Sequence, residues 1–275
     1  PYPAIRDYIA KQPAETLGID GAEVTHVWTD EPADAELVSQ VAMVENVVDR
    51  AEDVIGHVDA VLVATDKGEE HVDRCRPFVE AGIPIFVDKP LCNNRGDLAV
   101  FSKWIDAGHP LISSSAMRFA KEYMPYHRST HELGKLEYVN FTMAKSWETY
   151  GIHALEAVYS IVGPGFISVQ NTGDADRNIL HLRHRDNIDI NLVNIYGLAG
   201  GAGMMTLAGQ SGGVQLKMTD SYRAFKAQLM SFIEFLRTGS PPVPWDETKE
   251  LMQLVIAGIE SREAGGKTIY LKDLE

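Results

Sequence analysis

The stretch Val58-Asp59-Ala60-Val61-Leu62-Val63-Ala64-Thr65 and the stretch Pro84-Ile85-Phe86-Val87-Asp88-Lys89-Pro90 decide the fold of this chain. Each reads as a short buried strand, and the segment between them, residues 71–81, has apolar residues at helical spacing followed by a terminating glycine. A strand, a helix and a second strand in this order form a parallel unit. The carboxyl ends of such strands open into the crevice where α/β proteins bind nucleotides and carry out chemistry. The unit therefore predicts that Lys89 lies in such a crevice, at a fixed distance from the loop at Thr65.

Strands and helices alternate up to residue 118, which predicts a doubly wound parallel sheet. The expected strands are 24–29, 60–65, 84–87 and 111–115, and the expected helices are 4–10, 33–42, 71–81 and 94–107. After a helical segment around 122–131, longer strands are expected at 136–144, 166–172, 179–185 and 188–196, and amphipathic helices near 225–236 and 251–259. The glycine-rich segment 197–203 is expected to be a hairpin turn. We therefore predict a dinucleotide-binding domain in residues 1–118 and, in residues 119–275, an α+β domain with an open, largely antiparallel sheet that binds substrate and drives oligomerisation.

Composition excludes several classes of function. At 275 residues and 45% hydrophobic composition, the chain can bury a real core in two domains. No apolar run is long enough to span a membrane, and a net charge of −14 disfavours nucleic acid and anionic membranes as partners. The two cysteines, Cys75 and Cys92, form no disulfide framework and no metal-ligand spacing, so we expect no metal site and a reducing cytoplasmic location.

Short segments in a fixed order carry a resemblance to a known family. They are the strand ending at Ala64-Thr65, His71, the turn Ala81-Gly82, Asp88-Lys89-Pro90-Leu91, Met117-Arg118-Phe119, and Gly151-Ile152-His153. In order and spacing they resemble the glucose-fructose oxidoreductase / inositol dehydrogenase (Gfo/Idh/MocA) family over nearly the whole chain. The resemblance implies a Rossmann-like domain followed by an open sheet domain. It also implies nicotinamide-dependent oxidoreduction of a small sugar, polyol or related hydroxy compound.

The resemblance implies two catalytic residues. Lys89 would stabilise the alkoxide charge that develops on the reacting hydroxyl, although a lone lysine at a strand end is ordinarily solvated. His153 would accept the proton of that hydroxyl, although a histidine at a helix start is more often structural. The chain departs from the family where its catalytic aspartate stands, because the residue here is Thr149. Glu148 or Glu156 could replace that carboxylate, or each could be a surface or packing residue.

Further residues are assigned to ligands by the same resemblance. The cofactor-binding candidates are Asp30, Thr65, Asp66, His71, Asp88 and Lys89, and the substrate-binding candidates are Arg118, Lys145 and Trp147. Asp30 ends a strand where a carboxylate commonly binds the adenosine ribose, which favours NAD over NADP, although it also reads as a turn residue. Asp66 and Asp88 replace a proline and a glutamate of the family pattern, and His71 could equally serve as a solvated helix start.

No Gly-x-Gly-x-x-Gly loop follows a strand in this sequence. We therefore expect either that a first strand and its phosphate loop precede Pro1 or that dinucleotide binding has been lost. Two functions stay open: an NAD(P)-dependent oxidoreductase, with NAD as the expected cofactor, and a noncatalytic ligand-binding or assembly protein on the same scaffold. A dimer or tetramer is expected, because strands 136–144 and 188–196 alternate apolar and polar residues and leave one sheet face free.

Overall fold

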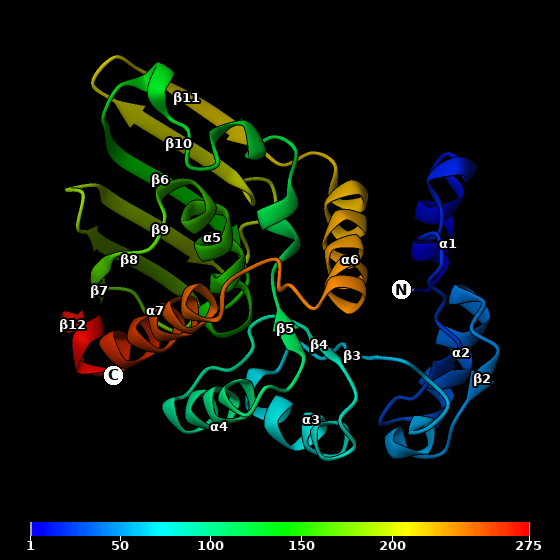
Figure 1. Cartoon of the computed structure of the whole chain (residues 1–275). Coiled ribbons are helices and arrows are strands. Elements are labelled where there is room, and N and C mark those ends of the chain that lie inside the picture. The colour runs from blue at the N-terminus through cyan, green and yellow to red at the C-terminus, as the bar shows by residue number, and fades with distance from the viewer. Residues whose placement is uncertain (1, 275) are drawn as a thin grey trace.

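The computed structural model describes residues 2–274, with side chains from residue 6 onward (Figure 1). The helices are α1 (Tyr2–Ala10), α2 (Pro32–Ala42), α3 (His71–Glu80), α4 (Arg95–Asp106), α5 (Trp147–Val162), α6 (Ser221–Thr238) and α7 (Trp245–Glu263). The strands are β1 (His26–Val27), β2 (Asn46–Val47), β3 (Val61–Val63), β4 (Ile85–Val87), β5 (Leu111–Ser113), β6 (Leu136–Ala144), β7 (Phe166–Asn171), β8 (Arg177–His184), β9 (Asp189–Ile195), β10 (Met204–Gly209), β11 (Gly212–Lys217) and β12 (Ile269–Tyr270). Within this described range, no helix is both long and apolar enough to cross a bilayer.

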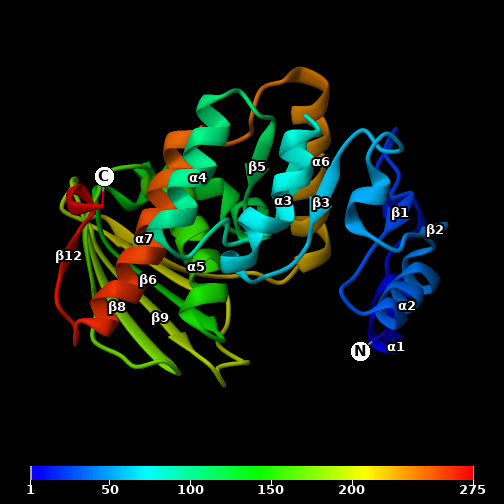
Figure 2. The ribbon, with the colours of Figure 1, turned by 90° about the horizontal axis from the view of Figure 1, so that it is seen from below.

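The strands β3, β4 and β5 form a parallel sheet that is covered on both faces. Ile85 and Val87 of β4 join the large hydrophobic core that includes α3 and α4. Phe86 points to the opposite face, where its ring lies 5.5 Å from that of Phe232 in α6. Figure 2 shows α6 beside these strands, so a helix from late in the chain completes the first part of the fold. Burial of both faces explains why these strands read as continuous apolar runs.

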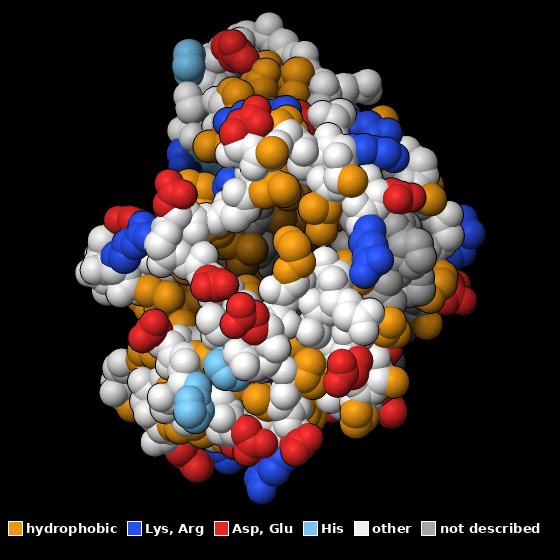
Figure 3. All heavy atoms as spheres, turned by 90° about the vertical axis from the view of Figure 1, so that its right-hand side faces the viewer, with side chains coloured by type: hydrophobic (Ala, Val, Ile, Leu, Met, Phe, Trp, Pro, Cys, Tyr) orange, Lys and Arg blue, Asp and Glu red, His pale blue; other side chains and the backbone are white. Residues whose placement is uncertain are grey.

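The first elements, α1, β1, α2 and β2, form a unit of their own, which we call the N-terminal module (residues 2–48). Its strands β1 and β2 pair in parallel, in a sheet separate from β3–β5. Polar contacts attach the module to α6, since the Tyr222 hydroxyl and the Lys226 ammonium both donate to the carbonyl of Thr16, at 2.8 Å and 2.5 Å. Figure 3 shows the face of the molecule on this side, where hydrophobic side chains surround a hollow.

The second sheet has seven strands in the order β11-β10-β6-β9-β8-β7-β12, all antiparallel except for the parallel pair β6–β9. Helices α5 and α7 pack on one face, and the other face carries no helix in Figure 1. In strand β8, for example, Leu180 and Leu182 are buried, whereas Ile179 is half exposed. These features confirm the predicted fold class, a Rossmann-like parallel sheet followed by an open, largely antiparallel one.

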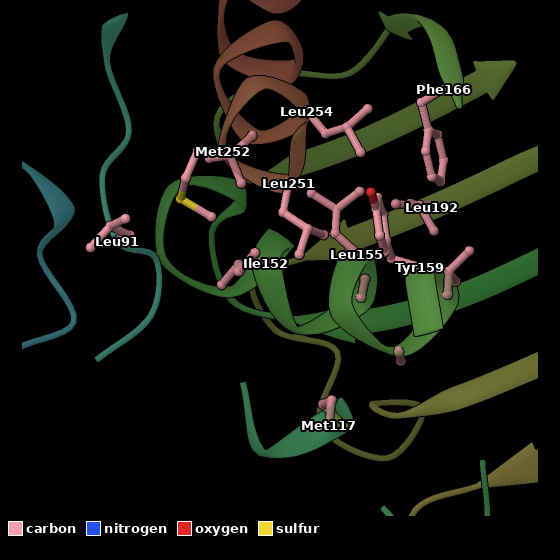
Figure 4. Close-up of a cluster of buried hydrophobic side chains, with 14 of the residues drawn as sticks. Leu91, Met117, Ile152, Leu155, Tyr159, Phe166, Leu192, Leu251, Met252 and Leu254 are labelled. Atoms are coloured by element: carbon pink, nitrogen blue, oxygen red, sulfur yellow. The ribbon is translucent and has the colours of Figure 1, made fainter. Parts of the chain in front are cut away.

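A continuous core joins the two sheets. Figure 4 shows Ile152 and Leu155 of α5 facing Leu251 of α7, with Leu91, from the loop after Lys89, beside the same cluster. Leu91 is fully buried. The loop that carries the predicted catalytic lysine is therefore anchored in the core of the second part of the chain. The division at residue 118 stays a prediction, because α6 and this shared core cross it.

Three sequence expectations were wrong in detail. Strand β2 was not predicted, and it has only two residues, both exposed. The helix expected around 122–131 is replaced by short 3₁₀ turns, because Arg128 adopts a left-handed backbone with φ of 51° that a continuous helix excludes. The segment 197–203 is not a hairpin turn, since β9 and β10 lie on opposite sides of β6.

Candidate active site

Lys89 follows β4 directly, so the strand places it at the carboxyl-terminal edge of the parallel sheet. Its side chain is almost buried, and its Nζ lies 3.6 Å from Oδ2 of Asp88. Burial raises the pKa of Asp88, and the adjacent Lys89 ammonium opposes that shift. The two residues form a partly desolvated ion pair at this edge of the sheet.

His71 ties the two loops of this edge together. Its Nδ1 lies 3.0 Å from the carbonyl oxygen of Leu91, and its Nε2 lies 2.9 Å from that of Thr65. The ring is fully buried. Both nitrogens are thus occupied by backbone atoms, so His71 positions the loops of Thr65 and Lys89 instead of presenting a nitrogen to a ligand.

Tyr150, in the first turn of α5, lies against two ammonium groups. The Nζ of Lys89 is 4.8 Å from the centre of its ring, and the Nζ of Lys145 is 4.1 Å from it. Lys145 also donates a hydrogen bond of 2.5 Å to the phenolic oxygen. Cations above an aromatic face are attracted by its quadrupole, so the ring holds two positive groups in one place.

His153 lies one turn further along α5, with its ring 4.9 Å from that of Tyr150. Its Nδ1 is 2.6 Å from the hydroxyl oxygen of Ser115, which follows β5. Burial, together with the smaller effects of the positive charges of Lys89 and Lys145, lowers the pKa of His153 to about 3. His153 is therefore neutral throughout the physiological range.

Among the described residues, no carboxylate hydrogen-bonds the ring of His153. The hydroxyl of Thr149 lies 2.8 Å from that of Ser146. Glu148 is paired with Arg262, and Glu156 is paired with Arg118 and accepts from the backbone N–H of Ser115. Neither glutamate replaces the missing aspartate, and the hydroxyl of Ser115 takes the position beside the imidazole.

Asp30 lies in the N-terminal module, after β1, and is paired with Arg74 of α3. The guanidinium donates to both carboxylate oxygens, at 3.1 Å and 2.8 Å. Hydrogen bonding to Arg74 lowers the pKa of Asp30, and the Asp30 side chain is still 65% exposed. Free lone pairs on this carboxylate can accept from ribose hydroxyls, but Arg74 neutralises much of its charge.

The described residues fit a dinucleotide at two places. By the resemblance described above, Lys89 would lie at the nicotinamide end and Asp30 at the adenosine ribose. Thr65 accepts a hydrogen bond of 3.3 Å from the N–H of Lys67, and Asp66 is exposed, so this loop offers a hydroxyl and a carboxylate but no glycine-rich cradle for the pyrophosphate. The donor set thus suits the two ends of the cofactor and leaves its centre without an assigned partner.

Two of the predicted substrate residues lie away from this cluster. Trp147 is fully buried and donates through Nε1 to the carbonyl of Val255 at 2.9 Å, so it holds α5 on α7 and is closed to ligands. Arg118 is nearly buried between Glu156 and Glu247. Only Lys145 of the three reaches the cluster.

Sequence reasoning missed Tyr150 and Ser115. A signal for Ser115 was available, because the run 113–115 ends β5 at the same sheet edge as Lys89. Tyr150 shares a helix with His153 at a spacing of three residues, which places both on one face. No group of three or more metal-binding side chains occurs in the described part of the chain.

Comparison with known proteins agrees with this geometry. The family model GFO_IDH_MocA, described as an oxidoreductase family with an NAD-binding Rossmann fold, matches residues 4–102. No curated protein matches the chain.

Solved structures resemble the chain over nearly its whole length. A putative myo-inositol dehydrogenase from Sinorhizobium meliloti 1021 has a TM-score of 0.79 at 18% identity, over 98% of this chain and 96% of that one. A myo-inositol dehydrogenase from Corynebacterium glutamicum ATCC 13032 has a TM-score of 0.76 at 20% identity, over 90% of each chain. A scyllo-inositol dehydrogenase from Lactobacillus casei, solved with bound NAD(H) and scyllo-inositol, has a TM-score of 0.79 at 14% identity, over 98% of this chain and 95% of that one. At such identities the likeness shows the fold.

Proposed function

We propose that this protein is an NAD-dependent dehydrogenase of the Gfo/Idh/MocA type, because residues 4–102 match the model of that oxidoreductase family. Its substrate would be a polyol, a sugar or a related hydroxy compound, a class to which the inositols named for its structural neighbours belong. Hydride would move between the nicotinamide and the carbon that bears the reacting hydroxyl. The low identities support the fold and the class of chemistry rather than one substrate.

The convergence of Lys89, Tyr150 and His153 at the carboxyl-terminal edge of β4 carries this proposal. When bound, nicotinamide supplies the hydride acceptor or donor. The Lys89 ammonium meets the negative charge that develops on the substrate oxygen, and its near-complete burial strengthens that interaction. His153 would act on the same oxygen, since both Lys89 and His153 lie against the ring of Tyr150.

We propose NAD as the preferred cofactor because the carboxylate of Asp30 would repel a 2′-phosphate. The open face of the seven-stranded sheet supports a homo-oligomer, since exposed Ile179 and Met204 lie on strands of that sheet. A cytoplasmic location is consistent with two free, buried cysteines.

Two measurements test the proposal. The first titrates NAD, NADH, NADP and NADPH into the protein by calorimetry, and tighter binding of NAD than of NADP is expected. The second follows NADH formation with a panel of inositols, sugars and sugar acids. Lys89→Ala should lower kcat by roughly a hundredfold or more, the scale for a lost catalytic group. Lys135→Ala removes a half-exposed lysine on the far sheet and serves as the matched control.

A noncatalytic binding protein stays the second candidate, because Thr149 leaves His153 without a carboxylate partner. That function predicts dinucleotide or polyol binding with no turnover by the wild-type protein. Turnover that depends on Lys89 would exclude it.

A further inference from the structure

The environment of His153 limits its role in proton transfer. The hydroxyl oxygen of Ser115 accepts a hydrogen bond of 3.1 Å from the backbone N–H of Met117. Among the residues that the structure describes, the acceptor for its own proton is Nδ1 of His153, at 2.6 Å. The buried hydroxyl thus donates to Nδ1, because an undonated buried proton would cost about 1–3 kcal/mol.

A ring that accepts at Nδ1 and is neutral carries its proton on Nε2. The lone pair needed to take a proton from a substrate hydroxyl is therefore already used, and the free side of the ring presents an N–H. A neutral imidazole of this kind can polarise a carbonyl or alkoxide oxygen as a hydrogen-bond donor. A carboxylate partner would have the opposite effect, because it would accept from Nδ1–H and leave Nε2 free as a base.

Tyr150 is better placed than His153 to exchange a proton with a substrate. Its hydroxyl bond to Lys145 lies on the exposed side of the cluster, whereas the bond between Ser115 and His153 is buried. Lys145 donates to the phenolic oxygen, so the phenolic proton stays free to be donated elsewhere. The charged or titratable side chains that the structure places against its ring are Lys89 from the β4 loop, Lys145 from the segment before α5, and His153 from α5 itself.

We propose that Tyr150, rather than His153, exchanges the proton with the reacting oxygen, with Lys145 stabilising the phenolate; this assignment rests on the proposed dehydrogenase function. In the direction of reduction, bound NADH would supply the hydride for the new C–H bond, and the carbonyl π-electron pair would move onto oxygen. The Tyr150 O–H bond then breaks, and its proton forms the substrate hydroxyl. The charge left on the phenolic oxygen is met by the ammonium of Lys145. Oxidation of the alcohol follows the same path in reverse, with NAD taking the hydride.

Lys145 acts here as a positioning residue, because its contact is with Tyr150. It occupies a left-handed backbone conformation with φ of 65°, and its N–H bonds the carbonyl of Tyr196 at 3.3 Å. Backbone of this kind is uncommon for residues other than glycine, and it directs the Lys145 side chain over the ring of Tyr150.

The test compares Tyr150→Phe with His153→Gln in steady-state kinetics. Phenylalanine keeps the ring against the two lysines and removes only the hydroxyl, and glutamine keeps an N–H donor near the position of Nε2. We expect Tyr150→Phe to lower kcat by about a hundredfold or more with the Kd for NADH unchanged, and His153→Gln to lower it by about tenfold. Tyr270→Phe, at a partly exposed tyrosine of β12, controls for the substitution itself.

Retention of more than about a third of wild-type kcat by Tyr150→Phe would overturn the assignment, as would a loss in His153→Gln as large as that in Tyr150→Phe. Absence of any turnover by the wild-type protein is a separate result, which would remove the proposed function and the role of Tyr150 with it. Thermal unfolding of each variant, compared with wild type, shows whether the fold is preserved.

Discussion

The two parallel sheets of this chain differ in what covers them. In β4 all three residues are buried, with one face against α3 and α4 and the other against α6. In the N-terminal module, β2 is exposed along its length, and α2 buries only Ala35. The β3–β5 sheet is therefore stabilised by packing and can hold Lys89 in place. The module that carries Asp30 depends on hydrogen bonds and ion pairs with its neighbours.

The largest expected effect tests this contrast in packing. Phe86→Ala should lower the free energy of unfolding by about 3–5 kcal/mol, because it deletes a buried ring between β4 and α6. Val47→Ala in β2, where the side chain is 37% exposed, should cost less than about 1 kcal/mol. Urea denaturation of both variants measures the two values. Similar losses would contradict the contrast.

The second prediction concerns the ion pair between Asp30 of the module and Arg74 of α3. Asp30→Ser should shift the ratio of Kd values toward NADP by about tenfold or more, equivalent to about 1.4 kcal/mol. The physical reason is that Arg74 loses its bidentate partner. Glu70 still accepts from Nε and Nη2 of Arg74, but Nη1 becomes available to the 2′-phosphate. Calorimetric titration with both cofactors measures the shift. Glu31→Ser, the adjacent exposed acid, is the control, and an equal shift there would refute a specific role for Arg74.

The features that the sequence could predict are those that follow from local patterns in the chain. The position of Lys89 was predictable, because a buried apolar run and its neighbouring helix specify a parallel strand and the edge where it ends. Trp147 was misjudged, because its burial depends on Gly258 of α7, where a Cβ would lie 2.4 Å from the indole nitrogen. Such a close approach between segments far apart in the chain leaves no local pattern.

The pairing of Ser115 with His153 was missed for a related reason. The family pattern points to a carboxylate at the position of Thr149. The group that contacts the imidazole of His153 is instead the hydroxyl of Ser115, which comes after a different element, β5. The Tyr150 cluster likewise needs three segments to converge, the β4 loop, the end of β6 and α5. The topology brings these three segments to one edge of the sheet. Which of their side chains touch depends on tertiary packing and does not follow from the spacing of residues in the sequence.

The third prediction concerns the buried residue His153 and the pH dependence of the free energy of unfolding. A histidine whose pKa falls from its usual 6.5 to about 3 in the folded state binds fewer protons there than in the unfolded chain at intermediate pH. Stability therefore rises with pH between about 3 and 6.5 and is lost as pH falls through that range. His153→Gln should reduce this slope by about 1.4 kcal/mol per pH unit near pH 5. Urea titrations at pH 4, 5, 6 and 7 measure it, and an unchanged slope would place His153 in a solvated site.

The smallest expected effect is in the N-terminal module, at the end of α2. Met43 has a left-handed backbone, with φ of 58°, and its side chain is 83% exposed, so it is strained without a packing gain. Met43→Gly should stabilise the module by about 0.5–1 kcal/mol, because glycine adopts this conformation at no steric cost. Met43→Ala removes the same side chain and keeps the strain, which makes it the matched control. Because the module makes few apolar contacts, it is expected to open without global unfolding, so hydrogen exchange of amides in residues 26–47 is the proper measurement. Slower exchange in Met43→Gly than in Met43→Ala supports a separately opening module. Equal exchange in the two variants, with a shared rise in the global unfolding midpoint, would show instead that the module and the β3–β5 sheet unfold together.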